Sequence, residues 1–235
     1  MDIPSTPVRG RPARLDATRT VETALDLLDA HGLDALTMRR LADAVGARAG
    51  ALYRYFATKQ DLLTAMAEYM LADVQKSVAA RPGAAGDWQD RLAGLAYGLR
   101  AALLARRDGA RVFAGTHSTG VNTLGFSEAV TGVLREAGFA DDDAVRALLV
   151  LANFTLGHTL EEQAVLQVEP SESAEIRRLS EAVAAGRFPN LAAGLHALAS
   201  ADYEAHFEFG LSLLIRGLEA LDRRVETRRG AGRPS

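Results

Sequence analysis

The chain of 235 residues contains no cysteine, which excludes disulfides, thiolate metal sites and a cysteine nucleophile. Aromatic residues make up only 6% of it, and β-branched residues are sparse beside alanine and leucine, a composition that favours an all-α protein. No apolar run approaches the roughly 18 residues that a membrane-spanning helix needs. The first residues also lack the apolar stretch of a signal peptide. We therefore expect an all-α, cytoplasmic protein.

The acidic and basic residues are unevenly distributed along the chain. The formal net charge is −3, yet residues 1–60 carry nine Lys and Arg against seven Asp and Glu. The remaining residues carry 18 against 23. This asymmetry indicates an N-terminal part that faces an anion, attached to an acidic body.

Helical periodicity with glycine and proline punctuation begins near Asp16. Gly32 and Gly46 are expected to end the first two short helices, and a third starts near residue 48 with Leu52 and Phe56 facing inward. Further helices are expected over residues 59–80, 87–107, 109–116, 122–137, 141–165, 173–185, 190–199 and 201–222.

Composition and periodicity together divide the chain into four parts. The Pro-, Gly- and Arg-rich residues 1–15 are expected to form a flexible basic arm, and residues 223–235, of similar composition, a disordered tail. Between them we expect a three-helix head over residues 16–62 and a larger helical domain over residues 63–222.

The head has two short helices separated by a tight turn that contains glycine, with basic residues at the start of the second helix. This is the helix-turn-helix layout. Small residues at 49–51 allow close approach to a major groove, arginines reach base edges or phosphates, and tyrosine hydroxyls suit phosphate oxygens. Taken singly, each residue is typical of a solvated surface, but together at this spacing they favour DNA binding. The predicted DNA-contacting residues are Thr37, Arg39, Arg48, Ala49, Gly50, Ala51, Tyr53, Arg54, Tyr55 and Lys59.

The basic arm leaves two interpretations open. The run RGRPAR at residues 9–14 can lie extended in a narrow, A·T-rich minor groove, whose negative potential attracts arginine. Alternatively, it is a disordered tail that adds nonspecific attraction to phosphates, which is the interpretation we favour.

The run G-x-x-x-L-T-x-R-x-L-A-x-x-x-G and the segment LYRYFATKQDLL are the most specific parts of the head. With them, about residues 16–65 resemble the N-terminal DNA-binding domain of the TetR family of transcriptional repressors. LLARRDGARVFAGT, EAGFADDDAVRALLVLANFTLGHTLEEQ and FEFGLSLLIRGLEAL resemble the effector domain of tetracycline repressors. The resemblance implies a ligand-responsive repressor whose heads enter successive major grooves of a pseudo-palindromic, double-stranded operator.

The resemblance also implies an Ω-shaped homodimer, held by a four-helix bundle from the 141–165 and 201–222 helices of each subunit. The pattern of these two helices supports the bundle independently, because they carry more apolar surface than one face needs. The residues concerned are Leu148, Leu151, Phe154, Thr155, Phe207, Phe209, Leu211, Leu214 and Leu218.

By the same resemblance, a small-molecule effector binds inside the larger domain, with the turn around Glu161 supplied by the partner subunit. Tetracycline repressors have a histidine that binds the drug-chelated Mg²⁺ where this chain has Phe113, and a second family histidine corresponds to Gln75. Leu95 and Leu99 occupy drug-contacting positions. We therefore expect no metal or other cofactor, and a largely apolar effector, a drug or natural product that controls efflux or resistance genes. The predicted ligand-binding residues are Gln75, Leu95, Leu99, Phe113, Thr116, Val130, Leu134, Phe154 and Glu161.

The residues also bear on two alternative functions, a metal-responsive regulator and an enzyme. A metal-responsive regulator would use His158, Glu161 and Glu162, which share one helical turn, with His117 approaching from a loop. An enzyme would need a recognisable catalytic motif. Its five histidines are accompanied by no Gly-rich phosphate loop, no serine nucleophile elbow and no repeated Glu-x-x-His motif. We expect no catalytic residue.

Overall fold

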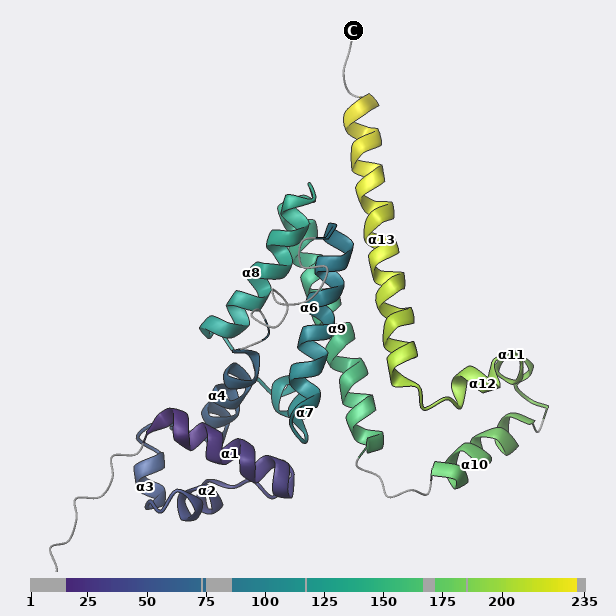
Figure 1. The fold of residues 1–235 in the computed structure, drawn as a ribbon. Helices are drawn as coiled ribbons and strands as arrows, with labels where there is room; N and C mark the ends of the chain where they lie inside the picture. Colours follow the sequence, from purple (N-terminus) through teal and green to yellow (C-terminus); the bar gives the residue numbers. More distant parts are fainter. Residues whose placement is uncertain are drawn as a thin grey trace, which may run out of the picture.

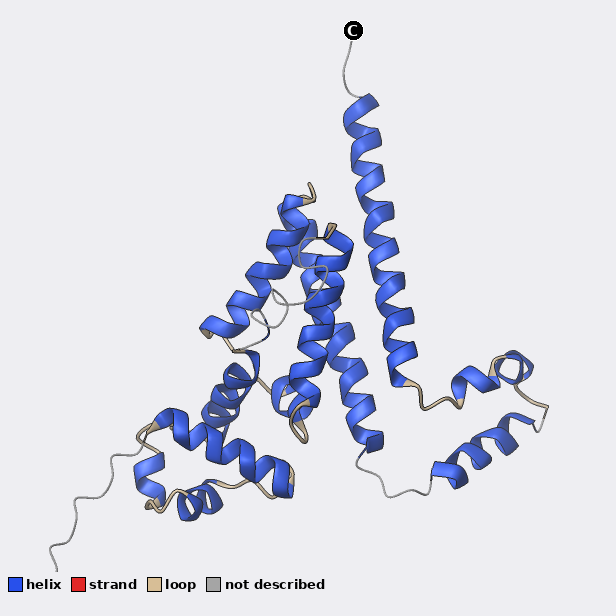
Figure 2. Ribbon diagram, viewed as in Figure 1, coloured by secondary structure: helices blue, strands red, loops and turns tan. Residues whose placement is uncertain are grey.

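The computed structural model of the protein describes residues 16–72, 74, 86–116, 118–166, 172–184 and 186–231. All regular elements in these ranges are helices, which confirms the all-α prediction (Figure 2). They form a small N-terminal head and a larger helical domain, here called the body, as Figure 1 shows. None of the helices in these ranges combines the length and the apolar character needed to cross a bilayer.

Three short helices make up the head, and capping sets their ends. Asp16 begins the first helix by accepting a hydrogen bond from the Thr18 amide, and Gly32, with a φ of 78°, ends it. Thr37 begins the second helix by accepting a hydrogen bond from the Arg40 amide. The helices are α1 (Ala17–His31), α2 (Met38–Ala44) and α3 (Ala49–Leu52).

The helix α4 (Lys59–Leu71) leads from the head into the body. A capping box between Thr58 and Asp61 fixes its start. Most of its buried residues belong to the head core, but Leu71 belongs to the body core together with Val74. One helix is therefore shared by two cores. The buried residues of the head core are Val21, Ala24, Leu25, Leu28, Leu36, Met38, Leu41, Ala42, Leu52, Phe56, Leu62, Met66, Ala67, Met70 and Val112.

The body consists of four helices packed on one another, with a long fifth helix, α13, lying along α9 and touching α6 (Figure 1). Its core contains fully buried Leu92, Leu103 and Phe207. Trp88 and Phe139 close one end with an edge-to-face contact between rings 5.3 Å apart. The helices are α6 (Trp88–Leu104), α7 (Gly109–Ala114), α8 (Val121–Glu136), α9 (Asp141–Leu166) and α13 (Tyr203–Ala231).

Three further helices between α9 and α13 lie to one side of the body in Figure 1. They carry exposed apolar side chains, among them Leu191 and Leu198, and Phe188 just before α11 is also exposed. The helices are α10 (Glu172–Ala184), α11 (Pro189–Ala193) and α12 (Leu195–Leu198).

The observed helices differ from the predicted ones in two places. The segment 190–199 is predicted as one helix but forms α11 and α12, because Gly194 interrupts it. The sequence predicts a disordered tail from residue 223, whereas α13 continues to Ala231. The run from 222 to 229 has no glycine or proline and is rich in arginine and glutamate, which favour helix. The basic arm 1–15 and the part of the predicted helix beyond Ala72, apart from Val74, lie outside the described residues.

Gly109 begins α7 directly beside the end of α6. A Cβ atom at this position would lie 2.2 Å from the carbonyl oxygen of Leu103, which is backbone and cannot move aside easily. We predict that Gly109→Ala lowers the free energy of unfolding by roughly 1–3 kcal/mol through overpacking, as measured by urea denaturation.

The matched control is Gly132→Ala in α8, where nothing lies within 4 Å of the new Cβ atom. This substitution is expected to leave stability unchanged or raise it by up to about 1 kcal/mol, because alanine favours helix over glycine. Equal effects of the two substitutions would contradict the close approach of α6 and α7.

Candidate nucleic-acid interface and effector site

The end of α3 presents two tyrosines and an arginine to solvent. Leu52 and Phe56, on either side of them in sequence, are buried in the head core and anchor the segment. Tyr53, Arg54 and Tyr55 are therefore exposed, the two tyrosines by 51% and 46%. Their hydroxyl and guanidinium groups are available to phosphate oxygens and base edges.

The other long DNA-contacting residues predicted from the sequence lie on neighbouring elements of the head. Arg39 is exposed in the first turn of α2, and Arg48 is exposed at the start of α3. Lys59 begins α4, and its Nζ donates to the carbonyl oxygen of Leu33 at 3.5 Å. Thr37 is exposed, but its hydroxyl oxygen is engaged in capping α2. The head thus presents its cations around α3.

The small residues of α3 are only partly accessible. Gly50 is exposed, whereas Ala49 and Ala51 are half-buried. Arg40, which is not among the residues predicted from the sequence, is exposed beside Arg39 in the first turn of α2. The adjacency of Arg40 to Arg39 in the sequence could have identified it as a further candidate for DNA contact.

The turn between α6 and α7 holds the head through one buried carboxylate. Asp108 is almost fully buried and has a φ of 55°, in the left-handed region. Its Oδ2 accepts from the Leu33 amide at 2.8 Å, and its Oδ1 accepts from Arg111 at 3.0 Å. Arg111 also donates to Asp34 at 3.0 Å, and these hydrogen bonds to Asp34 and Asp108 raise its pKa. The α1–α2 loop is thereby tied to the body.

A second set of contacts joins the end of α1 to the same turn. Asp29 accepts from the side chain of Arg106 at 2.6 Å and from the amide of Arg107 at 2.9 Å. The head therefore rests on the α6–α7 turn through polar contacts as well as through α4.

Four of the predicted effector-contacting residues lie together in the body core. Two come from α6 and two from α8, and all four are buried in one apolar cluster. Glu161, in contrast, is exposed near the end of α9, and Gln75 lies outside the described residues. The four clustered residues are Leu95, Leu99, Val130 and Leu134.

Phe113 occupies a junction between the head and the body. It is half-buried and packs against both apolar cores. The hydroxyl of Thr116 donates to the Phe113 carbonyl oxygen at 2.8 Å, which closes the end of α7. Phe154 of α9 stacks on Phe207 of α13, with ring centroids 5.3 Å apart.

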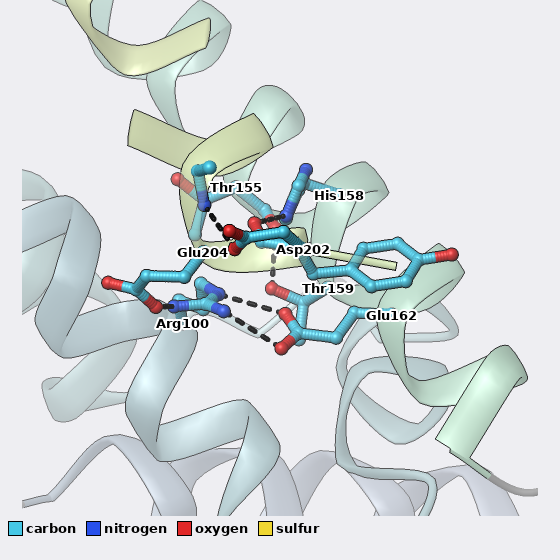
Figure 3. A network of polar contacts seen from close by, with 9 residues as sticks. Arg100, Thr155, His158, Thr159, Glu162, Asp202 and Glu204 are labelled. Carbon is cyan, nitrogen blue, oxygen red and sulfur yellow. Dashed lines mark hydrogen bonds and ion pairs between the residues drawn. The ribbon is translucent and has the colours of Figure 1, made fainter. Parts of the chain in front are cut away.

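A buried ion pair crosses the body (Figure 3). Nε and Nη2 of Arg100 donate to the two carboxylate oxygens of Glu162 at 2.9 and 2.8 Å, and Nη1 donates to Glu204. The guanidinium also lies 5.1 Å from the centre of the Phe207 ring. These contacts join α6, α9 and the start of α13.

The same network assigns other partners to two residues of the metal-binding alternative. Glu162 is paired with Arg100, and Nε2 of His158 donates to the Tyr203 carbonyl oxygen at 2.9 Å. Burial lowers the pKa of His158, and the hydrogen bond to Tyr203 only partly opposes that effect. Within the described ranges, no three His, Asp or Glu side chains are placed to hold a metal ion, and His117 lies outside those ranges. The structure therefore does not support a metal site here.

Two protein-family models match the chain and confirm the resemblance. "Bacterial regulatory proteins, tetR family" matches residues 21–66, and "Tetracyclin repressor-like, C-terminal domain" matches residues 82–221. The tetracycline repressor protein class A from transposon 1721 of Escherichia coli is 40% identical over 205 residues, which covers 87% of this chain and 91% of that relative.

Solved structures agree with these matches. A possible TetR family transcriptional regulator from Streptomyces coelicolor A3(2) has a TM-score of 0.78 and 62% identity, covering 88% of this chain and 100% of that chain. ActR of Streptomyces coelicolor in complex with actinorhodin has a TM-score of 0.77 and 30% identity, covering 94% and 100%. The chain therefore belongs to the TetR family of transcriptional regulators, is not an enzyme, and carries a tetracycline-repressor-like C-terminal domain.

Proposed function

We propose that this ligand-responsive repressor binds a pseudo-palindromic operator as a homodimer and is released by a largely apolar drug or natural product. The observation that carries the proposal is the exposed Tyr53–Arg54–Tyr55 segment, held outward by buried Leu52 and Phe56. Two exposed tyrosines and an arginine add little to the packing of the head. Their hydroxyl and guanidinium groups, in contrast, suit a surface that contacts DNA phosphates. The regulated genes are those for efflux of, or resistance to, the effector.

The effector follows from the chemistry of the body. Leu95, Leu99 and Phe113 have apolar side chains with no metal ligand atom, and the nearby Thr116 hydroxyl, which donates to the Phe113 carbonyl oxygen, can still accept a hydrogen bond as a polar anchor. A relative of this chain is named a tetracycline repressor, and the structural neighbour ActR binds actinorhodin. These names support a small-molecule effector, and the lack of a metal ligand atom on Leu95, Leu99 and Phe113 supports binding without Mg²⁺.

Dimerisation is supported by an apolar surface shared by α9 and α13. Leu149 and Phe209 are 56% and 66% exposed, although both are large and apolar. A groove of about 290 Å³ runs between the two helices. Exposed apolar patches of this kind mark interfaces, and a second copy of the same pair of helices would complete a four-helix bundle. The exposed apolar residues on the two helices are Val145, Leu149, Val150, Val165, Leu166, Phe209, Leu213 and Leu221.

Release of the operator requires the effector to favour a conformation in which the two heads cannot dock together. An effector with equal affinity for both conformations would shift nothing, however tightly it bound. The route to the heads is α4, because this helix belongs to both cores. Movement of the body wall around Phe113 would tilt α4 and change the separation of the heads.

Substitution in the head should separate DNA binding from effector binding. Arg54→Ala and Tyr53→Ala are each expected to weaken operator binding roughly tenfold or more, because each removes a phosphate or base contact. Effector affinity should stay nearly unchanged. The measurement is fluorescence anisotropy with duplex DNA from beside the protein's own gene.

The control for this experiment is Glu128→Ala, which removes an exposed charged side chain on α8, outside the head. It should leave operator affinity within about twofold, as expected for a surface change away from the interface. If Arg54→Ala lowered effector affinity and left DNA binding intact, the assignment of the head would be wrong.

The metal requirement of release gives a second test. Candidate compounds would be titrated into the protein–operator complex with Mg²⁺ and again with a chelator, while anisotropy is followed. We expect an apolar compound to release the operator equally in both conditions, because Phe113 cannot bind a metal ion. Release only by a tetracycline together with Mg²⁺ would keep the repressor and refute this account of the pocket.

A further inference from the structure

The carboxylate of Glu68, on α4, caps the start of α8. Its Oε1 accepts from the Ser118 hydroxyl at 2.6 Å, from the Thr123 amide at 3.2 Å and from the Thr123 hydroxyl. Its Oε2 accepts from the Asn122 amide at 2.8 Å. The backbone carbonyl oxygen of Glu68 accepts a further hydrogen bond from the Asn122 side chain at 2.9 Å. We call this set of contacts the Glu68 cap.

The start of α8 is shaped to receive this carboxylate. The N-cap residue, Gly120, has no side chain of its own to satisfy the first amides of the helix. A Cβ atom at Gly120 would lie 2.2 Å from Cδ of Glu68, so a larger residue would displace the carboxylate. A negative charge at a helix N-terminus is also favoured by the helix dipole.

The electrostatic state of Glu68 fits this role. Partial burial raises the pKa of its carboxyl, but the hydrogen bonds from Ser118, Thr123 and Asn122 outweigh burial and lower the pKa below its ordinary value. Glu68 is therefore ionised at neutral pH, and its contacts are charge-assisted hydrogen bonds.

The Glu68 cap joins the two parts of the protein that an effector must couple. Glu68 lies on α4 between Ala67 and Met70, two of the residues that α4 contributes to the head core. Ser118 belongs to the segment between α7 and α8, two residues after Thr116 and close to Phe113 in sequence. The cap therefore links α4 directly to a segment that borders the proposed effector site.

We propose that Glu68 is a positioning residue for operator binding: it fixes α4 to the start of α8 and so sets the separation of the two heads. The proposal rests on the dimeric repressor function proposed above. Apolar packing is non-directional, whereas four donors converging on one carboxylate define a single position for it.

The absence of cysteine makes the test simple, because one introduced cysteine gives one spin label per subunit. Asp43→Cys places the label at an exposed position on α2. Pulsed electron–electron double resonance on the labelled homodimer then measures the distance between the heads. Operator affinity is measured by anisotropy on the unlabelled protein, with duplex DNA from beside its own gene.

Glu68→Gln removes the charge while keeping the size of the side chain. We expect the distance distribution between the heads to shift or broaden, and operator affinity to fall roughly fivefold or more. The control is Glu128→Gln, which neutralises an exposed carboxylate on α8 itself and should change neither quantity. A purely structural role would lower the melting temperature and leave the distance between folded heads unchanged.

A second variant tests the cap from the other side and covers the case in which Glu68→Gln does not fold. Ser118→Ala with Thr123→Val removes two hydroxyl donors and leaves α4 intact, and the same shift in head separation is expected. An unchanged distribution and unchanged affinity in the folded variants would overturn the role of Glu68 alone. If the unsubstituted protein neither dimerised nor bound the DNA, the proposed function itself would fail.

Discussion

The burial of α4 in two apolar cores holds the head on the body. Met66 and Met70 of this helix pack in the head core, Leu71 packs in the body core, and Phe113 of α7 touches both. Because protein interiors are close-packed, a helix shared in this way cannot shift at one end without disturbing its neighbours at the other. A movement of Leu71 in the body core would therefore displace the part of α4 that packs in the head core.

Polar contacts add direction to this packing. Apolar burial is non-directional, but hydrogen bonds to a carboxylate depend on distance and angle. Asp108 holds the α1–α2 loop, Asp29 holds the end of α1, and Glu68 holds α4 against α8. Each carboxylate belongs to a different element, so together they define the orientation of the head. In the body, the hydrogen bonds between Arg100 and Glu162 fix α6 relative to α9 in the same directional way.

Local features of the sequence predicted the head well, because caps and exposed residues are local signals. Asp16 and Gly32 marked the two ends of α1, as the structure confirms, and the Tyr53–Tyr55 segment is exposed. Long-range pairs were missed. Glu162 was interpreted as a potential metal ligand because its partner, Arg100, lies on another helix, and nothing local distinguished Glu68 from an ordinary surface glutamate. The extended α13 was missed because basic residues were equated with disorder, although arginine and glutamate favour helix.

The central claim is that effector and operator act on one mechanical unit, so their binding free energies must be coupled. Calorimetric titration of a compound that releases the operator, into the free protein and into the protein–operator complex, tests this most directly. The account predicts weaker effector binding to the complex, by the same factor by which the effector weakens operator binding, since coupling is reciprocal. Equal effector affinity for the free and the operator-bound protein would contradict it.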